Sequence, residues 1–222
     1  MTVPCADQSI HEPEHRPVAL DVSDLAIASR RRRIGPFNLV VEVGEVVGLV
    51  GANGSGKTSC LRIVLGLDPA TTGAVRLHGR LVSPWRPPTD VGVVLEADGC
   101  YPWLTGRDNL ELFAGVLGCG ETEVDDRLAD AGLAPAADRT VRTYSRGMRQ
   151  RLAIARARLG DPSLLVLDEP TVALDEAATG WLVDALASHV DAGGSVLVAS
   201  HDPTFLDALG ARRVVVDGGR SR

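Results

Sequence analysis

The chain has 222 residues, of which 45% are hydrophobic and 4% aromatic, and its formal net charge is −6. This length accommodates one domain, or one domain with a small inserted lobe, and excludes a second large domain. The hydrophobic content excludes disorder of the whole chain, and the acidic balance argues against nucleic acid as a partner. The 24 glycines and the scarcity of aromatic residues are typical of an α/β protein.

The amino-terminal segment, residues 1–18, is predicted to be a flexible tail on a cytoplasmic protein, because it mixes charges with three prolines and lacks the apolar core of a signal peptide. The longest apolar stretch, 39–50, is interrupted by Glu42 and Glu45, so no membrane span is predicted. The basic run at 30–33 is interpreted as a solvated loop. A zinc site is not predicted and reduced thiols are expected, because the cysteines are widely spaced: Cys5, Cys60, Cys100 and Cys119.

Short β-type runs bounded by Gly, Pro or Asp come first and predict a partly antiparallel flank beside a parallel sheet; they are residues 19–27, 38–43, 46–50 and 74–78. Continuous apolar runs at 164–167 and 196–199 are typical of central parallel strands covered by helices on both faces. A helix is predicted over 176–192, and three more, over 107–117, 121–131 and 149–159, predict a helical lobe inserted into the core.

Residues 51–58 read Gly-Ala-Asn-Gly-Ser-Gly-Lys-Thr and match the pattern of a phosphate-binding loop between a strand and a helix. Glycines let backbone N–H groups face phosphate oxygens, and the helix N-terminus adds a partial positive charge. Lys57 is expected to neutralise the β- and γ-phosphates of a nucleotide, and the Thr58 hydroxyl to ligate Mg²⁺. The predicted nucleotide contacts are Gly51, Ala52, Asn53, Gly54, Ser55, Gly56, Lys57, Thr58 and Ser59.

The apolar run at 164–167 delivers two carboxylates, Asp168 and Glu169, at the strand end where parallel sheets bind ligands. Asp168 is expected to hold Mg²⁺, directly or through water. Glu169 is expected to orient the attacking water and act as a general base. The phosphate loop makes this interpretation preferable to an ordinary exposed strand end.

With these motifs the chain resembles the ATP-binding cassette (ABC) ATPases. The family's Leu-Ser-Gly-Gly-Gln signature corresponds to 144–148, Tyr-Ser-Arg-Gly-Met, in which Ser145 and Gly147 keep the family positions. The resemblance continues through the Ala-Leu-Asp segment 173–175 and the Ser-His-Asp segment 200–202, and it covers about residues 19–219.

The resemblance implies an α/β fold with a P-loop NTPase (RecA-like) core over 19–97 and 160–219, an antiparallel β flank and a helical subdomain over 98–159. It also implies a head-to-tail homodimer or heterodimer that binds two ATP molecules. In that dimer Ser145 and Gly147 face the γ-phosphate held by Lys57 of the other subunit. His201 contacts the γ-phosphate, and Asp175 lies across the dimer seam.

Two departures from the family pattern affect the expected turnover. Glu96 stands where the family commonly has Gln; its carboxylate can reach Mg²⁺ or its water but adds negative charge beside the phosphates. Hydrolysis is then slower, or more tightly tied to docking of the partner. Residues 28–33 contain no aromatic ring to stack on adenine, so either an arginine plane replaces it or the segment is a plain basic loop.

The implied function is an ATPase, peripheral on the inner face of the cell membrane, that drives separate transmembrane permease subunits. Residues 96–110 are expected to dock that partner, although Tyr101 and Trp103 suit packing of the lobe equally well. Glu96 and the signature resemble bacterial exporters of antibiotics and peptides. Three alternatives stay open: a haem-exporter ATPase of cytochrome c maturation, a soluble ABC ATPase outside transport, and a regulatory subunit with impaired catalysis.

Overall fold

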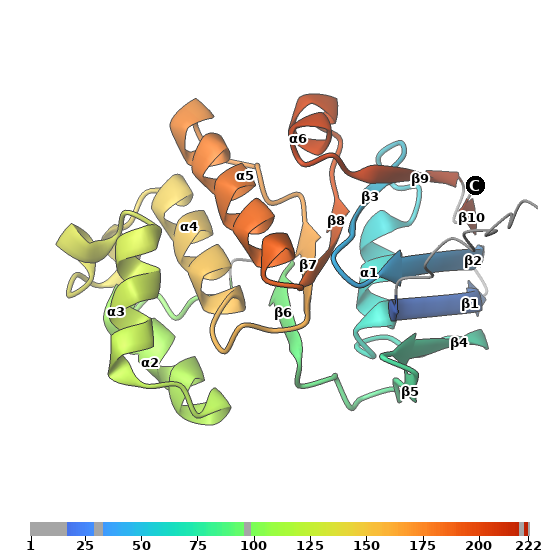
Figure 1. Cartoon of the computed structure of the whole chain (residues 1–222), viewed down its shortest axis with the longest axis horizontal. Coiled ribbons are helices and arrows are strands. Elements are labelled where there is room, and N and C mark those ends of the chain that lie inside the picture. The colour runs from blue at the N-terminus through green and yellow to red at the C-terminus, as the bar shows by residue number, and fades with distance from the viewer. Residues whose placement is uncertain (1–16, 29–32, 96–98, 218–219, 222) are drawn as a thin grey trace, which may run out of the picture.

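The computed structural model describes residues 17–28, 33–95, 99–217 and 220–221 (Figure 1). The predicted tail up to residue 16, Cys5, the basic run at 30–32 and Glu96 lie outside these residues. Strand β1 begins at Val18, the last residue assigned to the tail. None of the described helices is both long and apolar enough to cross a bilayer.

The strands form two sheets. The antiparallel sheet has the order β2 (Arg33–Glu42), β1 (Val18–Ala28), β4 (Thr72–Leu77) and β5 (Arg80–Leu81). The second sheet has the order β10 (Arg220–Ser221), β9 (Arg212–Asp217), β3 (Val46–Val50), β8 (Ser195–Ala199), β7 (Leu164–Asp168) and β6 (Val91–Val94). Its neighbours from β9 to β6 pair in parallel, so the predicted antiparallel flank and parallel sheet are confirmed.

Strand β7 shows why a continuous apolar run forms a central strand. Leu164 and Val166 enter a core shared with the antiparallel sheet and helix α1 (Lys57–Val64), whereas Leu165 and Leu167 enter a second core with α5 (Glu176–Asp191) and α6 (Pro203–Ala208). Both faces are therefore buried, as predicted. Helices lie on both faces, as predicted, and the antiparallel sheet joins α1 on one of them.

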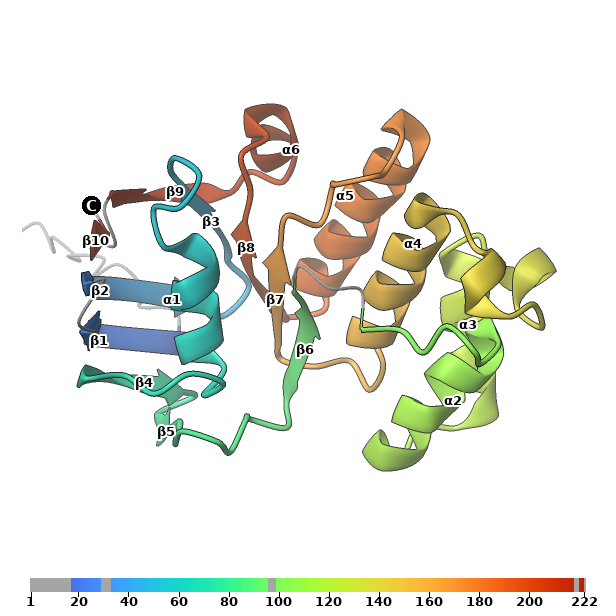
Figure 2. The ribbon, with the colours of Figure 1, turned by 180° about the vertical axis from the view of Figure 1, so that it is seen from behind.

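The helical lobe has a hydrophobic cluster of its own, built mainly on α2 (Gly106–Leu117), α3 (Glu121–Asp130) and α4 (Arg146–Ala157). Two 3-10 turns, Ala134–Ala136 and Val141–Thr143, connect α3 to α4. Figures 1 and 2 show α2 and α3 at one end of the molecule and the antiparallel sheet at the other.

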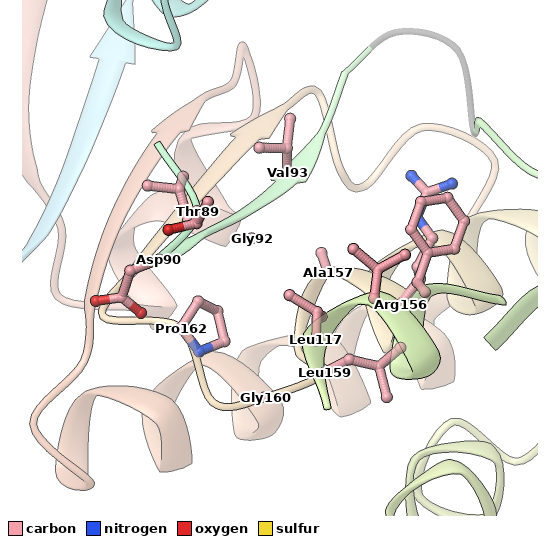
Figure 3. Close-up of a pocket in the computed structure, with 13 residues that line it drawn as sticks. Thr89, Asp90, Gly92, Val93, Leu117, Arg156, Ala157, Leu159, Gly160 and Pro162 are labelled. Carbon is pink, nitrogen blue, oxygen red and sulfur yellow. The ribbon is translucent and has the colours of Figure 1, made fainter. Parts of the chain in front are cut away.

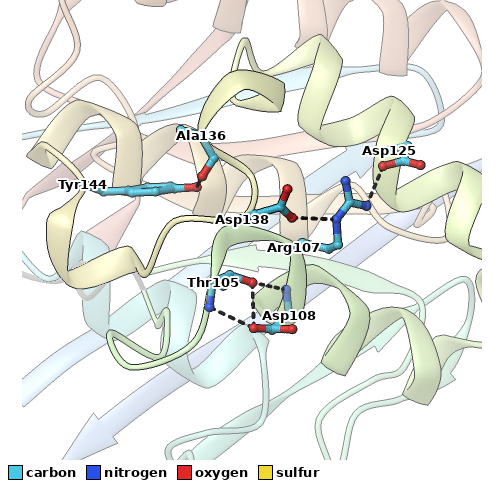
Figure 4. A network of polar contacts seen from close by, with 7 residues as sticks. All are labelled: Thr105, Arg107, Asp108, Asp125, Ala136, Asp138 and Tyr144. Carbon is cyan, nitrogen blue, oxygen red and sulfur yellow. Dashed lines mark hydrogen bonds and ion pairs between the residues drawn. The ribbon is translucent and has the colours of Figure 1, made fainter.

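Polar contacts fix the start of α2 and the approach to α4 (Figure 4). At the start of α2, Thr105 and Asp108 form a reciprocal capping box, with Asp108 N donating to Thr105 Oγ1 at 3.0 Å and Thr105 N donating to Asp108 Oδ2 at 3.0 Å. Before α4, the Tyr144 hydroxyl donates to Ala136 O at 2.7 Å, and burial raises the pKa of Tyr144. Because Tyr144 precedes Ser145, this bond anchors the approach to α4.

The differences from the predicted elements lie mostly at their ends. Helix α4 begins at Arg146 rather than at residue 149, because the Ser145 side chain caps it at 3.1 Å from Met148 N. Strand β2 begins at Arg33 rather than at residue 38. The sequence prediction missed β5, β6, α6, β9 and β10, none of which has more than 6 residues.

Candidate nucleotide site

The loop between β3 and α1 has the backbone of an anion-binding nest. Its glycines Gly51, Gly54 and Gly56 have φ angles of 154°, 76° and 115°, a region that side chains disfavour. At Gly51 a Cβ atom would also lie 2.3 Å from Val216 O. Gly56 is the N-cap of α1 and supplies no side-chain cap, so the first turn of α1 presents its N–H groups without a competing side-chain acceptor.

Lys57 is the only lysine among the 23 Lys and Arg residues of the chain, and it stands at the first position of α1. Its side chain is buried, and Nζ donates to the carbonyl oxygens of Gly51 at 2.8 Å and Ala52 at 3.4 Å. Phosphate oxygens are stronger acceptors for an ammonium than neutral carbonyls. The nearby Ser55 Oγ is buried and has no hydrogen-bond partner among the residues that the structure describes. These features fit a nucleoside phosphate.

A pocket of about 440 Å³ joins this loop to the end of β7 and is lined by Asn53, Gly54, Gly56, Lys57, Thr58, Ser59, Asp168 and Glu169. The structure therefore brings the two predicted motifs together, although they are about 110 residues apart. Asp168 is buried, with 4% of its surface exposed. Among the described residues there is no group of three His, Cys, Asp or Glu side chains suited to a metal. The Thr58 hydroxyl and the Asp168 carboxylate fit Mg²⁺ only in company with phosphate oxygens and water.

Glu169 and His201 are also adjacent. His201 Nδ1 lies 2.7 Å from Glu169 Oε2, and the His201 backbone N–H donates to the same oxygen at 3.3 Å. Glu169 is held with a φ angle of 46°, which is uncommon for a residue with a side chain. Its backbone N–H donates to Ala199 O of β8 at 2.8 Å. Both predicted residues therefore meet at the carboxyl ends of β7 and β8.

The pocket of Lys57 is not lined by the three residues predicted to act across a dimer interface, Ser145, Gly147 and Asp175. The predicted residues Gly51, Ala52, Ser55 and His201 do not line it either. Ser145 and Asp175 are the N-caps of α4 and α5, where their side chains accept from Met148 N and from Ala178 N. Gly147 is in the first turn of α4, and a Cβ atom there would lie 2.9 Å from Ala173 O. Their predicted contacts belong to the other subunit of a dimer and stay predictions.

A second pocket, of about 330 Å³, adjoins the first, since both include Asp168 and Glu169. Its other lining residues are Leu95, Arg146, Arg149, Gln150, Val172 and Ala173. The sequence analysis gave no role to Arg146, Arg149 or Gln150. A signal was present, because a helix that begins at Ser145 places residues 146, 149 and 150 on one face by their spacing of three and four.

The model of the ABC transporter family matches residues 34–172, well over half of the chain. The chain is 37% identical over 191 residues to Nod factor export ATP-binding protein I of Cupriavidus metallidurans, covering 83% of this chain and 63% of that protein. It is 36% identical over 211 residues to mouse ATP-binding cassette sub-family A member 7, covering 92% of this chain and 10% of that protein. The chain thus spans less than two thirds of the length of either relative.

A solved structure described as the ATP-binding subunit of an ABC transporter superposes with a TM-score of 0.84 at 27% identity, covering 91% of this chain and 88% of that one. The fold prediction is therefore confirmed, and the range matched by the family model, residues 34–172, includes both the phosphate loop and the acidic end of β7. On this evidence the chain belongs to the family of ABC transporter ATP-binding proteins.

Proposed function

We propose that this chain is the ATP-hydrolysing subunit of a membrane transporter. The observation that carries the proposal is the single pocket in which Lys57, Thr58, Asp168 and Glu169 meet. A phosphate nest, a lysine and two carboxylates at the end of a parallel strand are the parts that phosphoryl transfer needs, since such catalysis is mainly positioning and charge stabilisation.

Each part has a distinct role in the proposal. The N–H groups at the start of α1 hold phosphate oxygens, and Lys57 leaves its carbonyl partners to balance the β- and γ-phosphates. Thr58 and Asp168 hold Mg²⁺, which neutralises charge that develops on the phosphates. Glu169 orients a water molecule and accepts its proton, while His201 fixes Oε2 of Glu169 and lies beside the γ-phosphate.

The proposal includes a head-to-tail dimer, as a homodimer or with a related subunit. The first turn of α4 carries Ser145 and Gly147 and is a second anion-binding helix terminus, which closure of a dimer would bring to the γ-phosphate of the other subunit. Asp175, at the start of α5, would lie at the seam. Catalysis would then require closure of the dimer.

A groove of about 310 Å³ between β6 and α2 is the proposed contact for a cytoplasmic segment of the permease (Figure 3). Apolar side chains form much of its lining, and on α2 Val116 is 83% exposed and Leu117 47%. Tyr101 stacks on Phe113 of the same groove with ring centroids 6.5 Å apart, and Trp103 is 69% exposed. The docking site predicted for 96–110 therefore extends to α2 in the proposal, and the chain would be peripheral on the cytoplasmic face of the membrane.

Because Lys57 is the only lysine, an amine reagent gives a direct test of nucleotide binding. Mg-ATP is expected to protect Lys57 from acylation at least 10-fold, as measured by mass spectrometry of the peptide that contains it. The α-amino group of the same chain is the internal control and should react equally with and without nucleotide. Labelling of Lys57 that is indifferent to millimolar Mg-ATP would contradict the proposal.

Glu169→Gln tests hydrolysis. The change keeps size and hydrogen bonding but removes the base, so we expect turnover to fall at least 100-fold while the Kd for ATP changes less than about 3-fold. Steady-state phosphate release and calorimetry measure the two quantities. An ATP-bound dimer should accumulate on size-exclusion chromatography, and an unchanged turnover number would remove Glu169 from the mechanism.

We propose export as the direction of transport, supported by the named function of the Cupriavidus relative and by the signature. Relatives named for import are found as well as relatives named for export, so direction needs its own test. Vesicles that contain the chain with its permease should move cargo away from the face that receives ATP. Accumulation of cargo on the ATP face would establish import.

A further inference from the structure

The side chain of Gln150, on the second turn of α4, contacts the turn that follows β7. Its Nε2 donates to the carbonyl oxygen of Pro170 at 3.0 Å, and the contact is partly buried. Pro170 directly follows Glu169 and has no backbone N–H of its own. Gln150 therefore connects the helical lobe to the peptide unit next to the proposed general base.

The backbone around Glu169 needs such support. Its φ angle of 46° lies in a region that non-glycine residues occupy only when their surroundings enforce it. Ala199 O accepts from the Glu169 N–H at 2.8 Å, and Glu169 O accepts from the Val172 N–H at 3.1 Å. These bonds hold the turn against β8 and within itself. The hydrogen bond from Gln150 to Pro170 also attaches this turn to α4.

Helix α4 makes a second contact with the loop after β7, at Gly147, one helical turn before Gln150. At Gly147 a Cβ atom would lie 2.9 Å from Ala173 O, so only a residue without a side chain lets the backbones come this close. Gly147 and Gln150 are three residues apart and so lie on the same face of α4. The pocket that contains Gln150 also contains Asp168 and Glu169.

We propose that Gln150 is a positioning residue for Glu169: its hydrogen bond to Pro170 O fixes the turn that aims the carboxylate at the attacking water. The inference rests on the proposed ATPase function. It also predicts that a displacement of α4 reaches Glu169 through this bond, so the position of the helical lobe affects the rate of hydrolysis.

Kinetics of two variants test the role. Gln150→Leu removes the donor, and Gln150→Glu keeps the shape while the ionised carboxylate cannot donate. For both we expect kcat to fall about 10-fold to 100-fold, since a misplacement of about 1 Å can cost 100-fold, with KM for ATP changed less than about 3-fold. Gln150→Lys, which restores a donor, should recover at least a third of the wild-type kcat.

Arg151→Leu is the matched control. Arg151 is also on α4 and its Nη1 donates to a backbone carbonyl, that of Ala131, at 2.7 Å, but this carbonyl belongs to the helical lobe. This variant should lose thermal stability while keeping kcat within about 2-fold. If kcat of Arg151→Leu fell as much as kcat of Gln150→Leu, Gln150 would have only a structural role and the inference would be overturned.

A double-mutant cycle separates positioning from general damage. If Gln150 acts through the carboxylate, Gln150→Leu should slow single-turnover hydrolysis little when added to Glu169→Gln, because there is no base left to misplace. An equal fractional loss in both backgrounds would overturn the inference.

Hydrogen exchange distinguishes failure of the inference from failure of the proposed function. Without any nucleotide, Gln150→Leu should speed exchange of the Val172 amide at least 10-fold relative to wild type and to Arg151→Leu. If the wild-type chain hydrolyses no ATP, the proposed function fails, while this measurement still decides whether Gln150 holds the turn. Unchanged exchange would overturn the inference even in an active ATPase.

Discussion

Helices α1 and α4 both begin at a predicted phosphate-binding motif, but their first turns are capped in different ways. The N-cap of α1 is Gly56, in a left-handed conformation without a side-chain cap. The N-cap of α4 is Ser145, in an extended conformation, whose hydroxyl accepts from Met148 N at 3.1 Å. Helix α1 thus keeps its N–H groups for a ligand in the same subunit, whereas α4 satisfies one of its own.

In the proposed mechanism, the two helix termini act at different stages of ATP hydrolysis. The α1 terminus shares a pocket with Asp168 and Glu169 and is complete within one chain. Ser145, at the α4 terminus, is exposed and outside that pocket. In the proposed dimer, the self-capped terminus of α4 is stable before the other subunit brings its phosphate.

The largest effect is expected at α1. Lys57→Ala removes the ammonium that balances the phosphates, so the Kd for Mg-ATP should rise at least 100-fold in calorimetric titration. Arg80→Ala, an exposed cation on β5, is the control and should leave the Kd unchanged. Micromolar affinity retained by the Lys57 variant would show that the loop does not bind nucleotide as proposed.

At α4 the effect is expected on assembly rather than on binding. Ser145→Arg places a bulky cation where the other subunit's phosphate would arrive, so ATP-dependent dimerisation and hydrolysis should fall at least 10-fold while the Kd for ATP of one subunit stays within about 3-fold. Light scattering measures dimerisation, and phosphate release measures hydrolysis. Mixing with Lys57→Ala subunits should partly restore activity, because one composite site is then intact. Wild-type hydrolysis by Ser145→Arg alone would rule out the dimer mechanism.

Helix α2 provides a reference for a purely structural cap. Thr105→Ala removes the hydroxyl of the capping box, which should cost about 1 kcal/mol of unfolding free energy in urea titration. Affinity for ATP and kcat should stay within about 2-fold, because the cap lies in the helical lobe. A loss of nucleotide affinity larger than the loss of stability would show that α2 participates in the site.

The smallest expected effect is a pH dependence of the free energy of unfolding. It does not involve the first turns of α1 and α4. Burial lowers the pKa of His189, on α5, below its ordinary value of 6.5. The unfolded chain then takes up a proton first as pH falls below about 6.5, so the free energy of unfolding should decrease from there toward the lower folded-state pKa. His189→Gln should flatten this slope between about pH 7 and pH 5 in denaturant titrations. An equal slope in the variant would show that other groups cause the pH dependence of the free energy of unfolding.

Local sequence was sufficient for the parts whose geometry is set within a few residues. The spacing of Gly51, Gly56 and Lys57 predicted the loop and the start of α1, because a nest before a helix needs only neighbouring φ angles. The run before Asp168 predicted β7, because burial on both faces requires apolar residues throughout. The helix after the signature was predicted over 149–159, three residues too late, because periodicity did not reveal the cap at Ser145.

The tertiary structure decided everything that depends on contacts between distant segments. The contact of His201 with Glu169 requires β8 to lie beside β7, and the bond from Gln150 to Pro170 requires α4 to cross the end of that strand. No local pattern encodes such pairs, because their partners are 20 or more residues apart and are brought together by the burial of apolar faces. The sequence thus predicted which groups carry the proposed chemistry, and the packing of the sheet and α4 determines how these groups are oriented.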